Sequence, residues 1–182
     1  MIEAGAYAPG SWEEMFATPY SPEADVVVDR LRHEDVSIVG CLTFKSCRNL
    51  LDRAVAGQRD EGDALAFVAR TDGRPVGLVL AEKIRGGDEV AAGTRKILRL
   101  RSIFTNLLWQ HKGIGRWLLD TLTGGSRDAG YHAIHTEYNP KLESIQPFER
   151  LLASSGWSNP KPFMEELFAL VAAKSSVATV GL

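Results

Sequence analysis

Between a strand pattern and a helix pattern, the chain carries the segment Gln110-His111-Lys112-Gly113-Ile114-Gly115-Arg116. Residues 96–105 before it alternate as a strand does, and apolar residues from Ile114 to Leu122 recur at helical spacing. Two glycines allow the backbone to turn sharply and to approach a bulky ligand closely. The first N–H groups of the helix then point at that ligand, and the helix dipole favours negative charge there. The segment therefore predicts a site for an anion such as a phosphate.

Two well-known phosphate-binding motifs do not fit this segment. A P-loop has Lys and then Ser or Thr directly after its second glycine, whereas Gly115 is followed by Arg116 and Trp117. The dinucleotide-binding fingerprint needs a third glycine, and Leu118 stands at that position. The segment must therefore be interpreted in the context of the elements around it.

The chain shows strand and helix patterns in the order β-α-β-β-β-α-β-α-β. Strands are expected from Val26 and over residues 64–70, 76–84, 96–105, 133–138 and 163–171. Helices are expected within residues 34–57, from Ile114 to Gly130 and from Ser144 to Gly156. Asp72-Gly73 supplies the positive-φ positions that a hairpin between the second and third strands needs. An antiparallel meander thus leads into a β-α-β unit whose two strands, the fourth and fifth, run parallel.

The spacing Gln110-x-x-Gly113-x-Gly115 resembles the Q/R-x-x-G-x-G/A signature of the GNAT superfamily, the Gcn5-related N-acetyltransferases. Family members follow this loop with a helix, a fifth strand, another helix and a Gly-aromatic pair, which matches Gly156-Trp157 here. The resemblance covers about residues 25–172 and implies one α/β (α+β) domain over that range. Its mixed, mostly antiparallel twisted sheet would have flanking helices and parallel, splayed fourth and fifth strands. Residues 1–24 would form an N-terminal extension, and residues 173–182 a mobile C-terminal tail.

The resemblance implies an acyltransferase that moves an acetyl group from acetyl-CoA to an amine of a small molecule or peptide. The pantetheine arm would lie between the splayed strands and pair with the backbone of Ile103, Phe104 and Thr105. A backbone N–H near Thr105 would polarise the thioester carbonyl. The amides of His111, Lys112, Gly113, Ile114, Gly115 and Arg116 would cradle the pyrophosphate, and Gln110 would belong to the same cofactor-binding loop. The amine would attack the thioester directly, in a ternary complex and with no covalent intermediate on the enzyme.

A general base is expected because a free alkylammonium, with a pKa of ~10.4, must lose a proton before it attacks. Some family members place a glutamate on the fifth strand, and Glu137 matches it, although the spacing to the next helix is about three residues longer. Glu82, near the end of the third strand, is the second candidate, and His135, two residues before Glu137, is the third. Each of the three could instead be a solvated or salt-bridged strand residue.

The family's usual general acid is missing from this sequence. Many members carry a tyrosine four residues before the Gly-aromatic pair, and Leu152 stands there, while Ile145 replaces an asparagine seven residues earlier. Tyr138 is the nearest tyrosine, and its simpler interpretation is an aromatic ring packed at a strand end. Two alternatives stay open. The missing tyrosine motivates the first, a non-catalytic acyl-CoA-binding sensor or GNAT-like interaction domain. The second is a phosphate- or nucleotide-binding protein outside this family, which would prefer ATP or NAD to coenzyme A.

Basic residues gather on and before the fourth strand: Arg95, Lys96, Arg99 and Arg101. Strand alternation places Leu98, Leu100, Ser102 and Phe104 on one face, and Arg99, Arg101, Ile103 and Thr105 on the other. The basic cluster could hold an acidic substrate or the 3′-phosphate of coenzyme A, or it could be a solvated strand face.

Composition excludes several other classes of protein. The 182 residues include 21 Lys and Arg against 23 Asp and Glu, and this net charge of −2 argues against a general nucleic-acid binder. Cys41 and Cys47, with five residues between them, match no common metal-site spacing, so no metal is expected. The longest apolar run, residues 167–173, is too short to span a bilayer, and no secretory signal begins the chain. We therefore expect a cytoplasmic protein that binds neither membranes nor nucleic acids. The resemblance adds the possibility of a homodimer, because many family members dimerise.

Overall fold

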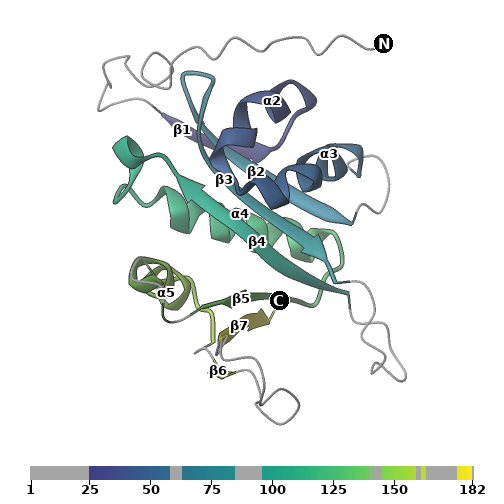
Figure 1. The fold of residues 1–182 in the computed structure, drawn as a ribbon, viewed down its shortest axis with the longest axis vertical. Helices are drawn as coiled ribbons and strands as arrows, with labels where there is room; N and C mark the ends of the chain where they lie inside the picture. Colours follow the sequence, from purple (N-terminus) through teal and green to yellow (C-terminus); the bar gives the residue numbers. More distant parts are fainter. Residues whose placement is uncertain are drawn as a thin grey trace.

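A seven-stranded sheet, with its strands in the order β1-β2-β3-β4-β5-β7-β6, organises the described part of the chain (Figure 1). The computed structural model describes residues 25–57, 63–84, 96–139, 141, 145–158, 161–162 and 176–181. The strands are β1 (Val26–Arg30), β2 (Ala64–Thr71), β3 (Arg74–Lys83), β4 (Ile97–Thr105), β5 (Ala133–Tyr138), β6 (Lys161–Pro162) and β7 (Ser176–Gly181). The helices are α2 (Val36–Val39), α3 (Arg48–Ala56), α4 (Ile114–Asp128) and α5 (Ile145–Ser154). Short 3₁₀ turns are η1 (His33–Asp35), η2 (Gly40–Leu42), η3 (Lys45–Cys47) and η4 (Leu107–Trp109).

Strands β1 to β4 form the predicted antiparallel meander. Asp72 (φ 47°) and Gly73 (φ 75°) make the tight turn between β2 and β3, as the sequence predicts. Every residue of β2 is buried, because β2 lies inside the sheet and both of its faces are covered. The mixed, mostly antiparallel fold class expected from the sequence is confirmed.

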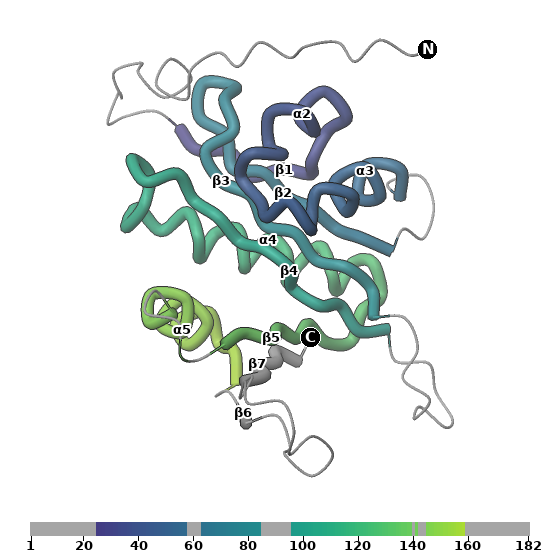
Figure 2. The backbone as a smooth tube through the Cα atoms, viewed as in Figure 1, coloured from purple at the N-terminus to yellow at the C-terminus, as the bar shows by residue number. Residues whose placement is uncertain are grey.

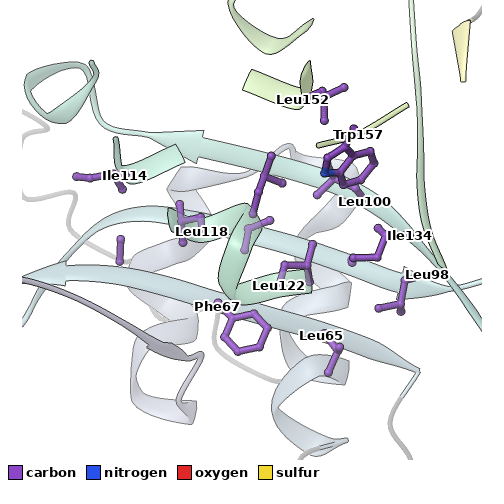
Figure 3. Packing of buried hydrophobic residues seen from close by; sticks show 14 of the residues in the cluster. Leu65, Phe67, Leu98, Leu100, Ile114, Leu118, Leu122, Ile134, Leu152 and Trp157 are labelled. Carbon is purple, nitrogen blue, oxygen red and sulfur yellow. The ribbon is translucent and has the colours of Figure 1, made fainter. Parts of the chain in front are cut away.

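The two faces of the sheet bury separate apolar clusters. On one face, α4 and α5 pack against the sheet through Leu118, Leu122 and Leu152 (Figure 3). On the other face, α3 packs through Leu50 and Leu51. Together with α2 it covers β2 and β3 on that side (Figure 1). The sheet is therefore a middle layer, and a site on one face is separated from a site on the other.

Helix α4 lies close to the sheet because two glycines leave room for it. A Cβ atom at Gly125 would come 2.5 Å from Cζ of Phe67, and one at Gly77 would come 3.1 Å from Cδ1 of Leu118. Interiors are close-packed, so added methyl groups at such positions force the layers apart. These contacts fix the distance between α4 and strands β2 and β3.

Strand β4 does not alternate as the sequence predicts. Its register against β3 shifts between Leu100 and Ser102, so Arg101 is a bulged extra residue. Leu98 and Leu100 face α4, but beyond the bulge it is Ile103 that packs into that cluster, while Phe104 is 38% exposed. The predicted faces of Ile103 and Phe104 are therefore wrong, because one extra residue reverses the period-two pattern.

Strands β4 and β5 run parallel and then separate. They pair only at Ile97↔Ala133, Leu98↔Ile134 and Arg99↔His135. Beyond those pairs the two strands diverge toward the end of β4 that leads into α4 (Figure 2). We call the position just after Arg99 and His135 the splay point. The splayed parallel pair expected from the resemblance is thus present.

The C-terminal part of the sheet differs from the sequence-based expectation. The strand expected at residues 163–171 and the N-terminal extension at residues 1–24 lie outside the described residues. The structure places β7 at Ser176–Gly181, in the stretch expected to be a tail, and pairs it antiparallel with the whole length of β5. The outer edge of β5 offers unpaired backbone groups, and this strand satisfies them.

Within the described ranges, no helix is both long enough and apolar enough to cross a membrane.

Candidate functional site

The loop before α4 presents a set of free backbone donors. Gly113 precedes the helix with φ 81°, and the first helical bond runs from the Trp117 N–H to the Gly113 carbonyl (3.0 Å). The N–H groups of Ile114, Gly115 and Arg116 therefore have no acceptor within the helix. Because these donors lie together at the positive end of the helix dipole, they form a site suited to a phosphate.

Local packing holds this loop in place. Ile114 is buried, and a Cβ atom at Gly115 would come 3.3 Å from Leu151 of α5, so the loop backbone lies tightly against its neighbours. His111, with φ 60°, is a non-glycine residue in the left-handed region, where backbone strain of about 1 kcal/mol is usual and often marks a functional loop. Lys112 lies over the Trp109 ring, 4.7 Å from its centroid. The loop is thus rigid and exposed, with basic side chains beside the free donors.

Gln110 has a structural role in this arrangement. Its Nε2 donates to the carbonyl of Thr105 (3.2 Å), which ties the loop to the end of β4. Asn106 supports the same corner, because its side chain accepts a hydrogen bond from the Leu108 N–H (3.0 Å). The resemblance implies that Gln110 belongs to the cofactor-binding loop, and in the structure its side chain fixes the geometry of that loop.

The edge of β4 that faces β5 is open beyond the splay point. The Asn106 N–H donates to the Val76 carbonyl of β3 (2.8 Å). Bonded and non-bonded pairs alternate along an antiparallel ladder, so Phe104 also directs its backbone groups toward β3. Ile103 and Thr105 then direct theirs the other way, toward the gap between β4 and β5. Of the three residues expected to pair with a pantetheine arm, Ile103 and Thr105 therefore face the gap, although the Thr105 carbonyl already accepts from Gln110.

Where the backbone pairing of β4 and β5 ends, a side-chain hydrogen bond continues the contact between the two strands. Thr136 is buried, and its hydroxyl donates to the carbonyl of Leu100 (3.3 Å), one position beyond the last paired residues. The hydroxyl satisfies a carbonyl that would otherwise be left buried without a partner where the strands part.

On the face opposite α4, charged residues gather around the splay point. We call this group the charged face, and its members are Arg53, Asp63, Glu82, Arg99, Arg101, His135 and Glu137. All three candidate bases belong to it: Glu82 lies on β3, and His135 and Glu137 lie on β5. The sequence identifies each of them as a candidate, and the structure shows that they lie on one face. The basic pair Arg99 and Arg101 lies on this face too.

The three candidate bases differ in how free their polar atoms are. Glu82 is 23% exposed, and its carboxylate contacts both Arg101 (3.2 Å) and Arg53 (3.6 Å). Glu137 is 38% exposed, and its Oε1 atom lies 3.5 Å from Arg99 and 3.5 Å from His135. These distances are long for hydrogen bonds, so the lone pairs of Glu137 are the more available ones.

The setting of His135 favours its neutral form. Burial lowers its pKa, and the nearby Arg99 guanidinium adds to that effect, while Glu137 acts in the opposite direction. Its Nε2 atom is buried without a hydrogen-bond partner among the described residues. A neutral imidazole can accept a proton, although a lowered pKa makes it a weaker base.

No tyrosine replaces the missing acid at the expected place. Leu152 lies on α5, is 3% exposed and packs into the apolar core. Tyr138, at the end of β5, packs edge-on against Phe148 (5.4 Å between centroids) and donates its hydroxyl to Glu149 (3.2 Å). Burial and the Glu149 carboxylate raise the pKa of Tyr138 to about 12. Its position therefore matches the packed aromatic residue that the sequence favoured.

Sequence reasoning missed two kinds of residue. Arg53 and Asp63 join the charged face from α3 and from the residue just before β2. No spacing in the sequence relates either of them to Glu82. Thr136 carried a weak signal, because it is a polar residue on the side of β5 where Ile134 faces the core.

Comparison with known proteins agrees with this geometry. The model of the acetyltransferase (GNAT) family matches residues 41–152, more than half of the chain. A solved structure from Desulfovibrio desulfuricans, assigned to the GNAT family, covers 86% of this chain and 99% of its own, at 15% identity and TM-score 0.67. Arabidopsis thaliana NAA60 in complex with acetyl-CoA covers 87% and 99%, at 13% identity and TM-score 0.63. The ribosomal-protein-S18-alanine N-acetyltransferase of Escherichia coli covers 86% and 94%, at 14% identity and TM-score 0.60.

Comparison with curated protein sequences gives no significant match. The solved structures share the fold at low identity, and the family model adds the match in sequence. The chain is therefore an enzyme of the acetyltransferase (GNAT) family.

Proposed function

We propose that this enzyme acetylates an amine of a small molecule or peptide, using acetyl-CoA, by direct attack within a ternary complex. One observation carries the proposal: the open edge of β4 at Ile103 and Thr105 lies beside the free N–H groups at the start of α4, since a Cβ atom at Gly115 would come 3.9 Å from the Thr105 hydroxyl. A long ligand with an amide-containing arm and a pyrophosphate needs this combination of a strand edge and an anion cradle.

The residues present fit acetyl-CoA. The N–H groups of Ile114, Gly115 and Arg116 would hold the pyrophosphate, and the space beside Gly113 is open, since an added Cβ atom there meets nothing within 4 Å. The backbone of Ile103 and the N–H of Thr105 would bind the pantetheine amides, since the Thr105 carbonyl already accepts from Gln110. The similar solved structure of Arabidopsis thaliana NAA60 is a complex with acetyl-CoA, and this supports acetyl-CoA as the ligand for the fold.

The charged face supplies the acid–base chemistry. Glu137 is our first choice for the base that takes a proton from the amine, directly or through a water molecule. Its carboxylate is more exposed than that of Glu82, and its contacts with cationic groups are longer. The amine nitrogen then forms a bond to the thioester carbon as the carbon–sulfur bond breaks and the electron pair leaves with sulfur. A backbone N–H on the open edge of β4 would stabilise the negative charge that develops on the carbonyl oxygen.

The proposal needs no tyrosine acid. An alkyl thiol has a pKa of ~8.5, so a thiolate is a stable leaving group near neutral pH. Tyr138 is a poor proton donor here because its hydroxyl already donates a hydrogen bond to Glu149 and its pKa is raised to about 12.

Steady-state kinetics with acetyl-CoA and a set of amines test the proposal. Direct attack predicts an acetylated amine, identified by mass spectrometry, and double-reciprocal plots that intersect. Parallel plots and an acetylated enzyme would contradict direct attack. If acetyl-CoA binds but no amine in a broad set is acetylated, the result would favour a non-catalytic acyl-CoA-binding protein. The buried Leu152, which stands where the family has its tyrosine acid, would be consistent with that outcome.

A further inference from the structure

A pocket of about 260 Å³ opens on the charged face, lined by Arg53, Glu82, Lys83, Ile84 and Arg99. It lies next to the splay point, because Arg99 is the last β4 residue that pairs with β5. Pockets for drug-sized ligands are ~300–1,000 Å³, so this one suits a smaller molecule or one end of a larger one.

Most charges around the pocket neutralise one another within the protein. Arg53 binds Asp63 with two hydrogen bonds (3.0 and 2.6 Å) and also contacts Glu82 at 3.6 Å. Glu82 is shared with Arg101, at 3.2 Å. Among the described residues, these four form a network in which two guanidinium groups contact two carboxylates.

Arg99 is different. It faces Glu82 directly across β3 and β4, yet the oxygens of Glu82 contact Arg53 and Arg101 instead. Its guanidinium makes no hydrogen bond to any described residue, and its nearest carboxylate oxygen, on Glu137, is 3.5 Å away. The Nε atom is buried without a partner within the described part of the chain. A guanidinium has five donors, and leaving them unused in a partly buried place is costly.

The surroundings of Arg99 favour an anion as its missing partner. His135, the β5 residue paired with Arg99, adds little positive charge of its own, since burial lowers the pKa of that imidazole. A carboxylate matches the planar fork of a guanidinium with two parallel hydrogen bonds. Glu137, whose carboxylate contacts Arg99 only at 3.5 Å, is the residue proposed to receive the proton of the amine, so an anion and an amine would be bound side by side.

We infer that the acceptor is a small amine that carries an anionic group, a carboxylate in the first instance, which binds Arg99 while the amine lies toward Glu137. This inference rests on the proposed function and names the substrate class for the same site. A molecule with ammonium and carboxylate groups a few bonds apart complements the arrangement of Glu137 and Arg99.

The test uses pairs of acceptors that differ only in charge. The common α-amino acids, β-alanine and γ-aminobutyrate are each compared with their own carboxamides, and 2-aminoethyl phosphate represents a phosphate in place of the carboxylate. Coenzyme A release is measured by chromatography, because Cys41 is a free and partly exposed thiol that could react with a thiol reagent. Binding of acetyl-CoA is measured separately by thermal shift in every protein variant.

Three variants make the result specific. Arg99→Gln removes the guanidinium, Arg99→Lys keeps the charge but not the fork, and Arg127→Gln removes the same charge from an exposed position at the far end of α4. We expect at least one acid to exceed its amide in kcat/KM by about tenfold or more, equivalent to at least 1.4 kcal/mol. Arg99→Gln should abolish that preference, Arg99→Lys should retain part of it, and Arg127→Gln should leave it unchanged.

Other outcomes separate this inference from the proposed function. If amides or peptides are acetylated as well as the acids, or if the preference survives in Arg99→Gln, the inference is wrong and the acetyltransferase stands. The inference also fails if acetyl-CoA binds but no anionic amine is acetylated. If 2-aminoethyl phosphate alone is preferred, the anion is a phosphate and the carboxylate assignment is overturned. If acetyl-CoA does not bind, the proposed function itself fails.

Discussion

The hydroxyl of Thr136 donates to the carbonyl of Leu100 across the point where β4 and β5 separate (3.3 Å). The backbone pairing of the two strands ends one residue earlier, at Arg99 and His135. A side chain therefore completes the last polar contact before the two strands part. The gap can begin at this position without leaving a buried carbonyl unsatisfied.

Replacing Thr136 with valine tests that role, because valine keeps the shape and removes the hydroxyl. The Leu100 carbonyl is then left without its donor, and we expect a loss of about 1–3 kcal/mol in the free energy of unfolding, measured in urea. Thr71→Val is the matched control, since the Thr71 hydroxyl is buried without a hydrogen-bond partner among the described residues. An equal loss in both variants would show that the contact at the splay point contributes nothing specific.

Two neighbouring glycines of α4 should respond to alanine in opposite ways. Gly125→Ala places a methyl group 2.5 Å from the buried ring of Phe67 and should cost about 1–3 kcal/mol of stability. Gly124→Ala meets nothing within 4 Å and should stabilise the helix by about 0.5–1 kcal/mol. Thermal unfolding of the two proteins decides the matter. If Gly125→Ala were as stable as Gly124→Ala, α4 would not lie as close to β2 as described here.

The order of elements and the anion-binding loop could be predicted because both depend on local patterns. Gly113 and Gly115 occur between a strand and an amphipathic helix, and Asp72-Gly73 determines a tight turn without help from distant residues. The final strand β7 also has a signal in the sequence, since Val177, Thr179 and Val180 are β-branched.

The details of the site depend on contacts between distant segments. The bulge at Arg101 arises from pairing with β3 and reverses the faces of all later β4 residues, which no period-two pattern can anticipate. Arg53 and Glu82 meet only because α3 packs over the end of β3. The candidate bases could therefore be named from the sequence, but their relative availability could not.

Glu137→Gln should impair catalysis while leaving the binding of acetyl-CoA unchanged. Removal of a general base lowers kcat by about 10²–10⁴-fold. The comparison variant is Glu82→Gln, in which Arg53 and Arg101 lose a shared partner. We expect that change to cost about 1 kcal/mol of stability and to reduce kcat less than Glu137→Gln does. If Glu82→Gln lost more activity at equal stability, Glu82 would be the base.

His135 should make stability fall as the pH becomes acidic. Burial and the Arg99 guanidinium lower its pKa in the folded protein, whereas the unfolded chain has a histidine pKa of ~6.5. Between the lowered folded value and ~6.5 the unfolded state binds a proton that the folded state does not, so stability decreases as pH falls through this window. In His135→Asn that part of the decrease should disappear, as urea denaturation from pH 7 to pH 5 can show. Identical pH profiles for the two proteins would rule out a buried neutral histidine at this position.

The most direct test of the central claim is a thermal-shift titration with acetyl-CoA, run beside ATP and NAD on the native protein and two variants at Gly113. A ligand at 100 times its Kd stabilises by ~2.7 kcal/mol, which at ~2–4 °C per kcal/mol predicts a rise in Tm of roughly 5–11 °C.

Asn and Asp both tolerate the left-handed backbone of Gly113, and only Asp adds a negative charge beside the free N–H groups. The account predicts a rise with acetyl-CoA that persists in Gly113→Asn and is largely lost in Gly113→Asp. A rise with ATP or NAD but not with acetyl-CoA, or equal rises in the two variants, would contradict it.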